Sequence, residues 1–153
     1  VATTLGLARG HWGDAPNVTR LVVPGDTRLL VVGDTHGQLE DVLWLFFKHG
    51  PPSRKNQYIF NGDIVDRGGH ALEILLLLIV LKRDDPSCVH IIRGNHEDET
   101  TSNMFGFKAE VESKFGPGGA SGWILSLCNQ GLFAVLPLAA VVTDATTSFS
   151  MCV

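Results

Sequence analysis

The sequence has 153 residues, of which 44% are apolar and 18% charged, and its formal net charge is −4. This composition is typical of one globular domain with its own core. The acidic balance argues against a nucleic-acid partner, and the longest apolar run, residues 74–81, is too short to span a membrane. The 3 cysteines form no C-x-x-C pair, so we expect reduced thiols and an intracellular protein, cytoplasmic or nuclear.

The amino-terminal third predicts a β-hairpin and a helix. Leu21–Val23, the turn at Pro24-Gly25-Asp26 and a strand at 28–32 have the pattern of a hairpin. Residues 38–49 follow with helical spacing and end before a Gly-Pro-Pro stop. We expect this helix to bury one apolar face, formed by Leu39, Val42, Leu43, Phe46 and Phe47.

The middle of the chain predicts a β-α-β-α-β unit. Strands at 28–32, 58–60 and 89–92 alternate with helices at 38–49 and 71–82. Crossovers of one hand bring the carboxyl ends of such strands to one edge of the sheet. His90, in the middle of the last strand, is expected to be packed rather than to bind a ligand.

The remaining third predicts helices and a terminal hairpin. A polar segment after Glu97 leads to a helix at 107–114, a flexible loop at 116–119 and a helix at 121–133, in which Trp123 is expected in the core. Strands at 139–143 and 148–153 would then pair across a turn at 144–147.

All three strands of the β-α-β-α-β unit end in a glycine followed by a hard oxygen ligand. The three stretches are Gly33-Asp34-Thr35-His36-Gly37, Gly62-Asp63-Ile64-Val65-Asp66-Arg67-Gly68 and Arg93-Gly94-Asn95-His96-Glu97. Each has an ordinary interpretation by itself: an exposed turn, a solvated ion pair or a structural histidine. Three such motifs in one order at one spacing favour a common site, at the edge where open α/β sheets bind ligands.

The residue types suit two metal ions and a phosphate. Asp34, His36 and Asp63 can hold one divalent cation, and a bridging Asp63 with Asn95 can hold a second. Mixed oxygen and nitrogen ligands favour Mn, Fe or Zn over Ca. Two such ions make a bridging hydroxide at neutral pH for attack on phosphorus. Arg67 suits phosphate oxygens, and His96, oriented by Asp66, suits protonation of the leaving alkoxide.

The three motifs resemble the signature blocks of the phosphoprotein phosphatases, the serine/threonine phosphatases among the calcineurin-like metallophosphoesterases. Residues 105–110 and 136–139 resemble the eukaryotic members, and Asn61 and Asp98 resemble the branch linked to EF-hand or tetratricopeptide modules. The resemblance implies an α/β fold, a β-sandwich flanked by helices, of which this chain would hold about the first half. Residues 1–26 would be a lead-in, and 27–153 a partial catalytic domain truncated at its carboxyl end.

The resemblance also implies roles for matching residues. Asp34, His36 and Asp63 would bind the first metal, Asp63 and Asn95 the second, and Arg67 the phosphate. His96, supported by Asp66, would be the acid, with Arg93 and Glu97 as positioning groups. The family adds two later histidines and a second arginine with no match here, so we expect a fragment that is marginally stable, binds one metal better than two and has little activity alone.

Several interpretations remain open at this stage. The parent protein would dephosphorylate phosphoserine and phosphothreonine in proteins, with regulatory subunits or fused regulatory modules as partners. The chain would otherwise be a non-catalytic metal-binding or regulatory module, or a dinucleoside polyphosphate or phosphodiester hydrolase.

Overall fold

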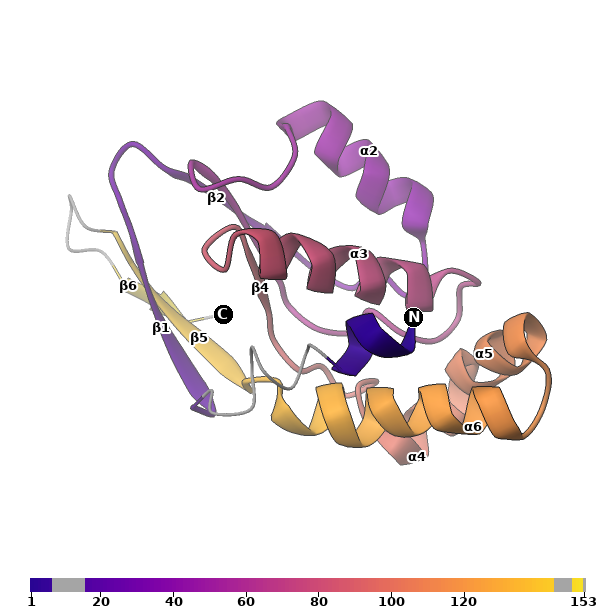
Figure 1. Cartoon of the computed structure of the whole chain (residues 1–153). Helices are drawn as coiled ribbons and strands as arrows, with labels where there is room; N and C mark the ends of the chain where they lie inside the picture. The colour runs from indigo at the N-terminus through magenta and orange to yellow at the C-terminus, as the bar shows by residue number, and fades with distance from the viewer. Residues whose placement is uncertain (7–15, 145–149, 153) are drawn as a thin grey trace.

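The computed structural model of the protein describes residues 1–6, 16–144 and 150–152, whose strands form two three-stranded sheets (Figure 1). One sheet has the order β1-β5-β6, with β1 at Val18–Val23, β5 at Ala139–Asp144 and β6 at Ser150–Cys152. The other has the order β2-β3-β4, with β2 at Arg28–Val32, β3 at Asn56–Phe60 and β4 at Val89–Ile91. All pairs in the second sheet are parallel, as the β-α-β-α-β pattern predicts.

The helices lie on the side of the second sheet that faces away from β1 and β5 (Figure 1). Those that connect the parallel strands are α2, Leu39–His49, and α3, Ala71–Asp84. After β4 come α4, Glu99–Phe105, α5, Phe107–Phe115, and α6, Gly119–Ser126. A π-helical segment, Leu127–Leu132, and a 3-10 turn, Phe133–Val135, then lead into β5.

Strand β3 divides the core into two layers because its side chains alternate between the faces of the sheet. Tyr58 and Phe60 pack on the helix side, in the main cluster with α3. Ile59 points the other way and packs with Ala140 and Val142 of β5, so the two sheets are joined by a smaller apolar layer. The expected α/β fold, a sandwich flanked by helices, is confirmed.

The predicted hairpin between 21–23 and 28–32 is wrong. β1 pairs in parallel with β5, from Val18 opposite Ala139 to Val23 opposite Asp144. The turn is present, with the Thr27 N–H donating to the Pro24 carbonyl at 2.9 Å, but it passes the chain from one sheet to the other. Val23 reaches the inter-sheet layer from β1, so burial in the sandwich outweighs the local pairing that the turn would allow.

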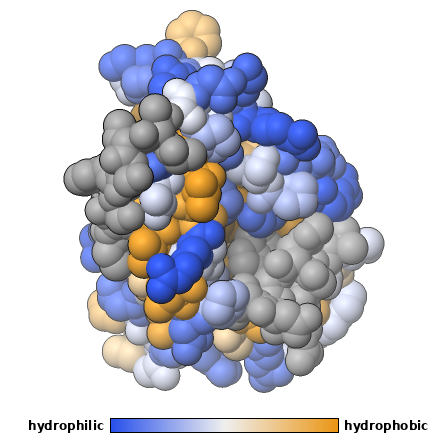
Figure 2. Space-filling view, turned by 90° about the vertical axis from the view of Figure 1, so that its left-hand side faces the viewer, coloured by the Kyte–Doolittle hydropathy of each residue, from blue (hydrophilic) through white to orange (hydrophobic). Residues whose placement is uncertain are grey.

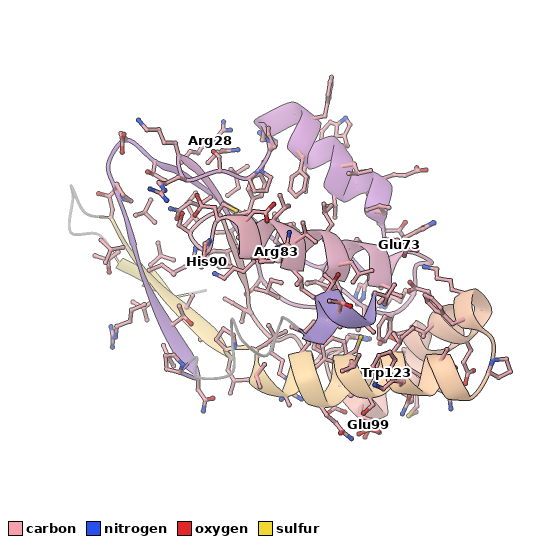
Figure 3. The ribbon with its side chains drawn as sticks, viewed as in Figure 1. Arg28, Glu73, Arg83, His90, Glu99 and Trp123 are labelled. Atoms are coloured by element: carbon pink, nitrogen blue, oxygen red, sulfur yellow. The ribbon has the colours of Figure 1, made fainter. Side chains whose placement is uncertain are left out.

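Two helix predictions are partly wrong. On α2, Val42 is buried as expected, but Phe47 is 89% and Leu43 49% exposed. This helix covers the sheet with a narrow stripe, so three of its seven apolar residues are exposed. Trp123, expected in the core, is 59% exposed on α6 (Figure 3), whereas Leu125 and Cys128 are buried.

Two further differences concern helix boundaries. The polar segment after Glu97 contains a helix, α4, whose start is capped by Asp98 through the N–H groups of Thr100 and Thr101. The helix expected at 121–133 is divided into α6, the π-helical segment and the 3-10 turn. The expected hairpin is present as the antiparallel pair of β5 and β6. Its turn lies mostly outside the described residues.

Apolar side chains gather on the surface at the side of the molecule where β1 lies (Figure 2). Val22 is 67% and Val18 45% exposed, because alternate residues of β1 face away from the second sheet.

In the described part of the chain, no helix combines the length and the apolar character needed to cross a membrane.

His90 on β4 is half-buried, as predicted, and its Nε2 donates to the Ser87 carbonyl at 3.1 Å. Desolvation, with a smaller contribution from Lys82, lowers the pKa of His90 to about 4. Between pH 6.5 and about 4 the unfolded chain therefore binds a proton that the folded protein does not, and stability falls as the pH falls through this window.

We expect His90→Gln, which keeps a donor for Ser87, to remove this loss. The free energy of unfolding is measured by urea titration between pH 4 and 7. As the pH falls through this window, it should decrease by up to roughly 3 kcal/mol more in the wild type than in the variant. Parallel curves for the two proteins would contradict the lowered pKa.

Candidate metal centre

The three glycine-led stretches, residues 33–37, 62–68 and 93–97, meet at the carboxyl ends of β2, β3 and β4. We call them the first, second and third loops. The carbonyl of Asp63 accepts the N–H groups of Thr35 and His36, at 3.1 and 3.0 Å, and the carbonyl of Ile64 accepts that of Gly37 at 2.8 Å. Backbone bonds thus join the first loop directly to the second. The parallel order of the strands brings together residues that lie about thirty positions apart in the sequence.

One buried carboxylate, that of Glu97, joins the second loop to the third. Oε2 accepts the N–H groups of Asp63 and Gly94 at 2.7 and 2.9 Å, and Oε1 accepts those of Ile64 and Val65 at 2.9 and 3.2 Å. Burial raises the pKa of Glu97, and the four N–H groups act in the opposite direction. Because each oxygen already accepts two donors, the geometry fits the ionised form.

Glycines allow the backbones of the second and third loops to touch. A Cβ on Gly62, whose φ is +83°, would collide with the backbone of Gly94. A Cβ on Gly94 would in turn collide with the side chain and backbone of Asp63. The motif needs glycine at these two positions because any side chain would push the carboxylate of Asp63 away from the third loop.

Four non-glycine residues of these loops have left-handed backbones. They are His36, Asp63, Asp66 and Arg67, with φ values of 41°, 50°, 72° and 63°. Each such conformation costs an L-residue roughly 1–2 kcal/mol, and strain of this kind gathers at functional sites. All four belong to the set of candidate site residues.

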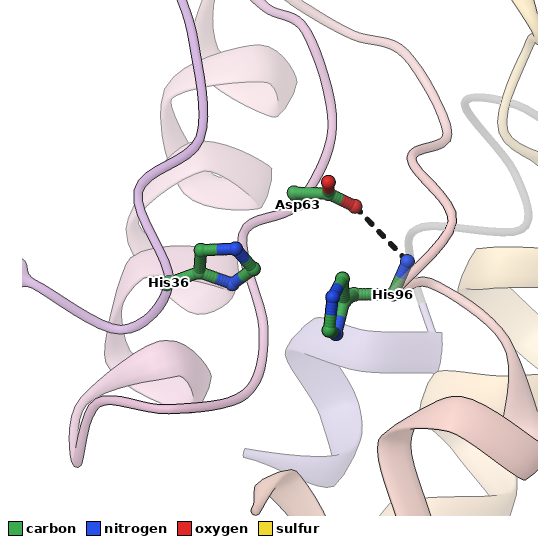
Figure 4. A group of neighbouring side chains, drawn as sticks. All are labelled: His36, Asp63 and His96. Atoms are coloured by element: carbon green, nitrogen blue, oxygen red, sulfur yellow. Dashed lines mark hydrogen bonds between the residues drawn. The ribbon is translucent and has the colours of Figure 1, made fainter. Parts of the chain in front are cut away.

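His36, Asp63 and His96 form a compact cluster (Figure 4), in which one potential ligand atom from each lies within 4.8 Å of the others. His36 Nδ1 donates to the Val65 carbonyl at 2.7 Å, which leaves the Nε2 lone pair free for a metal. That Nε2 is buried and has no hydrogen-bond partner among the described residues. A buried nitrogen without a partner beside a carboxylate is the environment that a divalent cation would satisfy, so the residues fit a metal.

Asp66 and His96 form a buried pair next to this cluster. Asp66 Oδ2 lies 2.7 Å from His96 Nδ1, and Asp66 is fully buried. Since a carboxylate only accepts, Nδ1 carries the hydrogen of this bond. The His36 and His96 rings meet edge to face, with centroids 4.7 Å apart. The backbone N–H of His96 also donates to Asp63 Oδ1 at 3.0 Å (Figure 4).

The other predicted site residues lie at the border of the cluster. Asp34 Oδ2 is 3.8 Å from His36 Nε2, and its side chain is 61% exposed. Asn95, in the third loop, and Arg67, in the second, are exposed. Arg93 donates from Nε to the Glu97 carbonyl at 2.9 Å, and its guanidinium lies 3.6 Å from Asp98. Arg93 therefore contacts the protein rather than the open side of the site.

Sequence reasoning missed two contributions from the segment after α4. The N–H of Phe107 donates to Asp66 Oδ1 at 2.8 Å. Glu110 is buried, and its carboxylate accepts the N–H groups of Ala71 and Leu72 at 3.1 and 3.0 Å. A glutamate on the apolar side of α5, between the buried Phe107 and Val111, was the available signal.

Comparison with known proteins agrees with this geometry. The calcineurin-like phosphoesterase family matches residues 27–151, and the chain belongs to this family. Within it, the chain is 41% identical over 129 residues to serine/threonine-protein phosphatase 5 of Solanum lycopersicum, covering 84% of this chain and 22% of the relative. It is 39% identical over 129 residues to serine/threonine-protein phosphatase with EF-hands 1 of Rattus norvegicus, covering 84% and 20%.

A solved structure gives the same result. The chain superposes with a TM-score of 0.84 and 36% identity on a serine/threonine phosphatase from Saccharomyces cerevisiae with similarity to human phosphatase PP5. The match covers 92% of this chain and 44% of that structure. The predicted resemblance to this branch of the serine/threonine phosphatases is confirmed, and the chain spans about a fifth of the length of the first curated relatives.

We expect His36→Ala to weaken Mn²⁺ or Zn²⁺ binding by about tenfold or more, because it removes the buried nitrogen that lacks a partner. His70→Ala is the matched control, since His70 is exposed and lies outside the cluster. Isothermal titration calorimetry with each metal measures the effect. Equal affinities in the two variants would contradict a metal site at His36.

We expect Glu97→Gln to lower the free energy of unfolding by roughly 2–4 kcal/mol, because an amide cannot accept from four buried N–H groups. Glu99→Gln, at an exposed position two residues away, should change it by less than about 0.5 kcal/mol. Urea unfolding followed by circular dichroism compares them. Similar midpoints would show that Glu97 does not hold the loops together.

Proposed function

We propose that these residues belong to the active site of a metal-dependent phosphatase that hydrolyses phosphoserine and phosphothreonine in proteins. The observation that carries the proposal is the cluster of His36, Asp63 and His96, with Asp66 behind His96. The names of the relatives agree with the chemistry of this arrangement.

His36, Asp63 and Asp34 would hold one divalent cation, and Asp63 with Asn95 a second. Bound cations supply a nucleophile from water at neutral pH and neutralise charge on the phosphoryl oxygens. Among the described residues, the first metal would have His36 and Asp63 close together, with Asp34 beside them. The second metal would have only Asp63 and an exposed Asn95. We therefore expect the chain by itself to bind one metal better than two and to have little turnover.

His96 would act as the acid. Its Nδ1–H is fixed by the buried Asp66, so the ring cannot rotate, and Nε2 is the atom that can give a proton to the leaving serine or threonine oxygen. These contacts give Asp66 an orienting role and His96 the proton-donating role.

Arg67 would bind the phosphate. Arg67 is exposed, while its backbone N–H donates to the Phe105 carbonyl at 3.2 Å and holds the left-handed backbone. Five N–H groups in a planar fork suit two oxygens of one phosphoryl group. The fixed backbone would aim that fork while leaving the side chain free to meet a substrate.

Binding and turnover test the proposal together. With Mn²⁺ present, we expect a phosphoserine peptide to bind more tightly than its unphosphorylated form, and Arg67→Ala to reduce this preference about tenfold or more. Arg54→Ala, an exposed arginine away from the three loops, is the control. Mass spectrometry of the metal-loaded protein should give nearer one ion than two, and phosphopeptide turnover should lie far below that of the Saccharomyces cerevisiae phosphatase measured in parallel.

Three results would contradict the proposal in different ways. Two tightly bound metals with full turnover would show that other residues complete the second position. Faster turnover of diadenosine tetraphosphate than of the phosphopeptide would indicate a dinucleoside polyphosphate hydrolase. Metal binding without any preference for the phosphorylated peptide would favour a non-catalytic metal-binding module.

A further inference from the structure

Helices α3 and α5 both begin without a cap of their own. Neither His70 before α3 nor Gly106 before α5 offers a side-chain cap to its helix. The first N–H groups of a helix need acceptors, and a carboxylate there also suits the helix dipole. Both helices obtain this carboxylate from the other segment.

The two caps are reciprocal. Asp66, five residues before α3, accepts the N–H of Phe107, the first residue of α5. Glu110, in α5, accepts the N–H groups of Ala71 and Leu72, the first two residues of α3. Each helix start is therefore fixed by an acidic residue that lies next to the start of the other helix.

Lys114 completes this connection one turn after Glu110. Its Nζ donates to Glu110 Oε1 at 2.7 Å, to the Gly69 carbonyl at 2.8 Å and to Glu73 at 2.5 Å. We name residues 105–114 the clamp segment, because it contacts the turn at 66–72 at both ends. Phe105 and Phe107 meet the turn at Arg67 and Asp66, and the Glu110–Lys114 pair meets it at 69–72.

The two strained residues Asp66 and Arg67 lie at the first of these two ends, where Phe107 and Phe105 contact the turn. Both oxygens of Asp66 are engaged, Oδ1 by α5 and Oδ2 by His96, so a shift of α5 relative to α3 moves the Asp66 carboxylate. The turn has little freedom on its other side, since a Cβ on Gly68 would collide with the His36 carbonyl. The clamp segment is thus the element that sets where Asp66 lies.

We infer that Glu110 is a positioning residue for the Asp66–His96 pair and for Arg67, acting through the start of α3 and the turn at 66–72. The functional meaning of that position rests on the phosphatase activity proposed above. The geometric coupling of Glu110 to Asp66 and His96 does not rest on that activity, and it can be measured without metal, phosphate or turnover.

The test compares Glu110→Gln with Glu112→Gln, an exchange of the same type on the same helix. No hydrogen bond or ion pair of the Glu112 side chain is found in the described ranges. Amide hydrogen exchange is followed at Ala71, Leu72 and Phe107, with the Tyr58 amide, bonded to the Cys88 carbonyl, as the reference for global unfolding. The imidazole Nδ1–H signal of His96 reports directly on its bond to Asp66.

We expect Glu110→Gln to accelerate exchange at Ala71, Leu72 and Phe107 by about tenfold or more beyond any change at Tyr58. The His96 Nδ1–H signal should shift or broaden, because Asp66 no longer lies in one place. Glu112→Gln should change none of these. Lys114→Met is a milder second variant, with a smaller effect in the same direction, and serves if Glu110→Gln does not fold.

Two results would overturn the inference. Equal acceleration at Tyr58 and at the three reporter amides would show that Glu110 contributes only to global stability. Faster exchange at Ala71 and Leu72 with an unchanged Phe107 amide and His96 signal would show that Glu110 caps α3 and does not position the pair. Failure of the phosphatase proposal would instead appear as absent metal or phosphopeptide binding in the wild type, with the exchange pattern unaffected.

Discussion

Four backbone N–H groups from two different loops converge on one carboxylate, that of Glu97, and the site depends on this convergence. A carboxylate buried away from water needs hydrogen-bond donors in place of its hydration, because each missing donor leaves part of the lost hydration energy uncompensated. The loops must therefore adopt the conformation that presents all four donors. That conformation also carries Asp63 and His96 to the same small space, so a purely structural requirement places two candidate functional groups.

The cost of this arrangement appears as backbone strain at Asp63, Asp66 and Arg67. Left-handed residues persist only when their surroundings outweigh their preference for other conformations. Here the left-handed conformations are stabilised by hydrogen bonds to other segments. Glu97 accepts from Asp63, the Phe107 N–H donates to Asp66, and the Phe105 carbonyl accepts from Arg67. Each of these strained residues is therefore held from outside its own loop.

The sequence predicted the parallel sheet and the position of the three loops at its strand ends well, because both leave periodic or local signals. Apolar runs of strand length, separated by helical spacing, identify β2, β3 and β4, and the glycine-led motifs identify the ends of these strands. The pairing of β1 with β5 leaves no local signal, since its registry depends on residues about 120 positions away. A nearby turn therefore suggested a hairpin that burial between the sheets overrides.

Side-chain burial on the helices was harder to predict for a related reason. Phe47 and Trp123 have the composition of core residues, yet both are exposed, because the face that a helix buries depends on the neighbours it meets in the fold. Glu110 is the opposite case, a charged residue buried by partners on another helix. Spacing within one segment describes that segment alone, whereas these three positions are decided by contacts between segments.

The parallel pairing of β1 with β5 also has a consequence for the order in which the protein forms. On the ribosome, Val18–Val23 emerges long before Ala139–Asp144, and at 5–20 residues per second the wait is on the order of ten seconds. During that time the second sheet and its helices, built from nearer contacts, can assemble, while β1 presents an unpaired apolar strand. Chaperones that bind extended apolar segments would therefore meet this chain at β1, before β5 has emerged to pair with it.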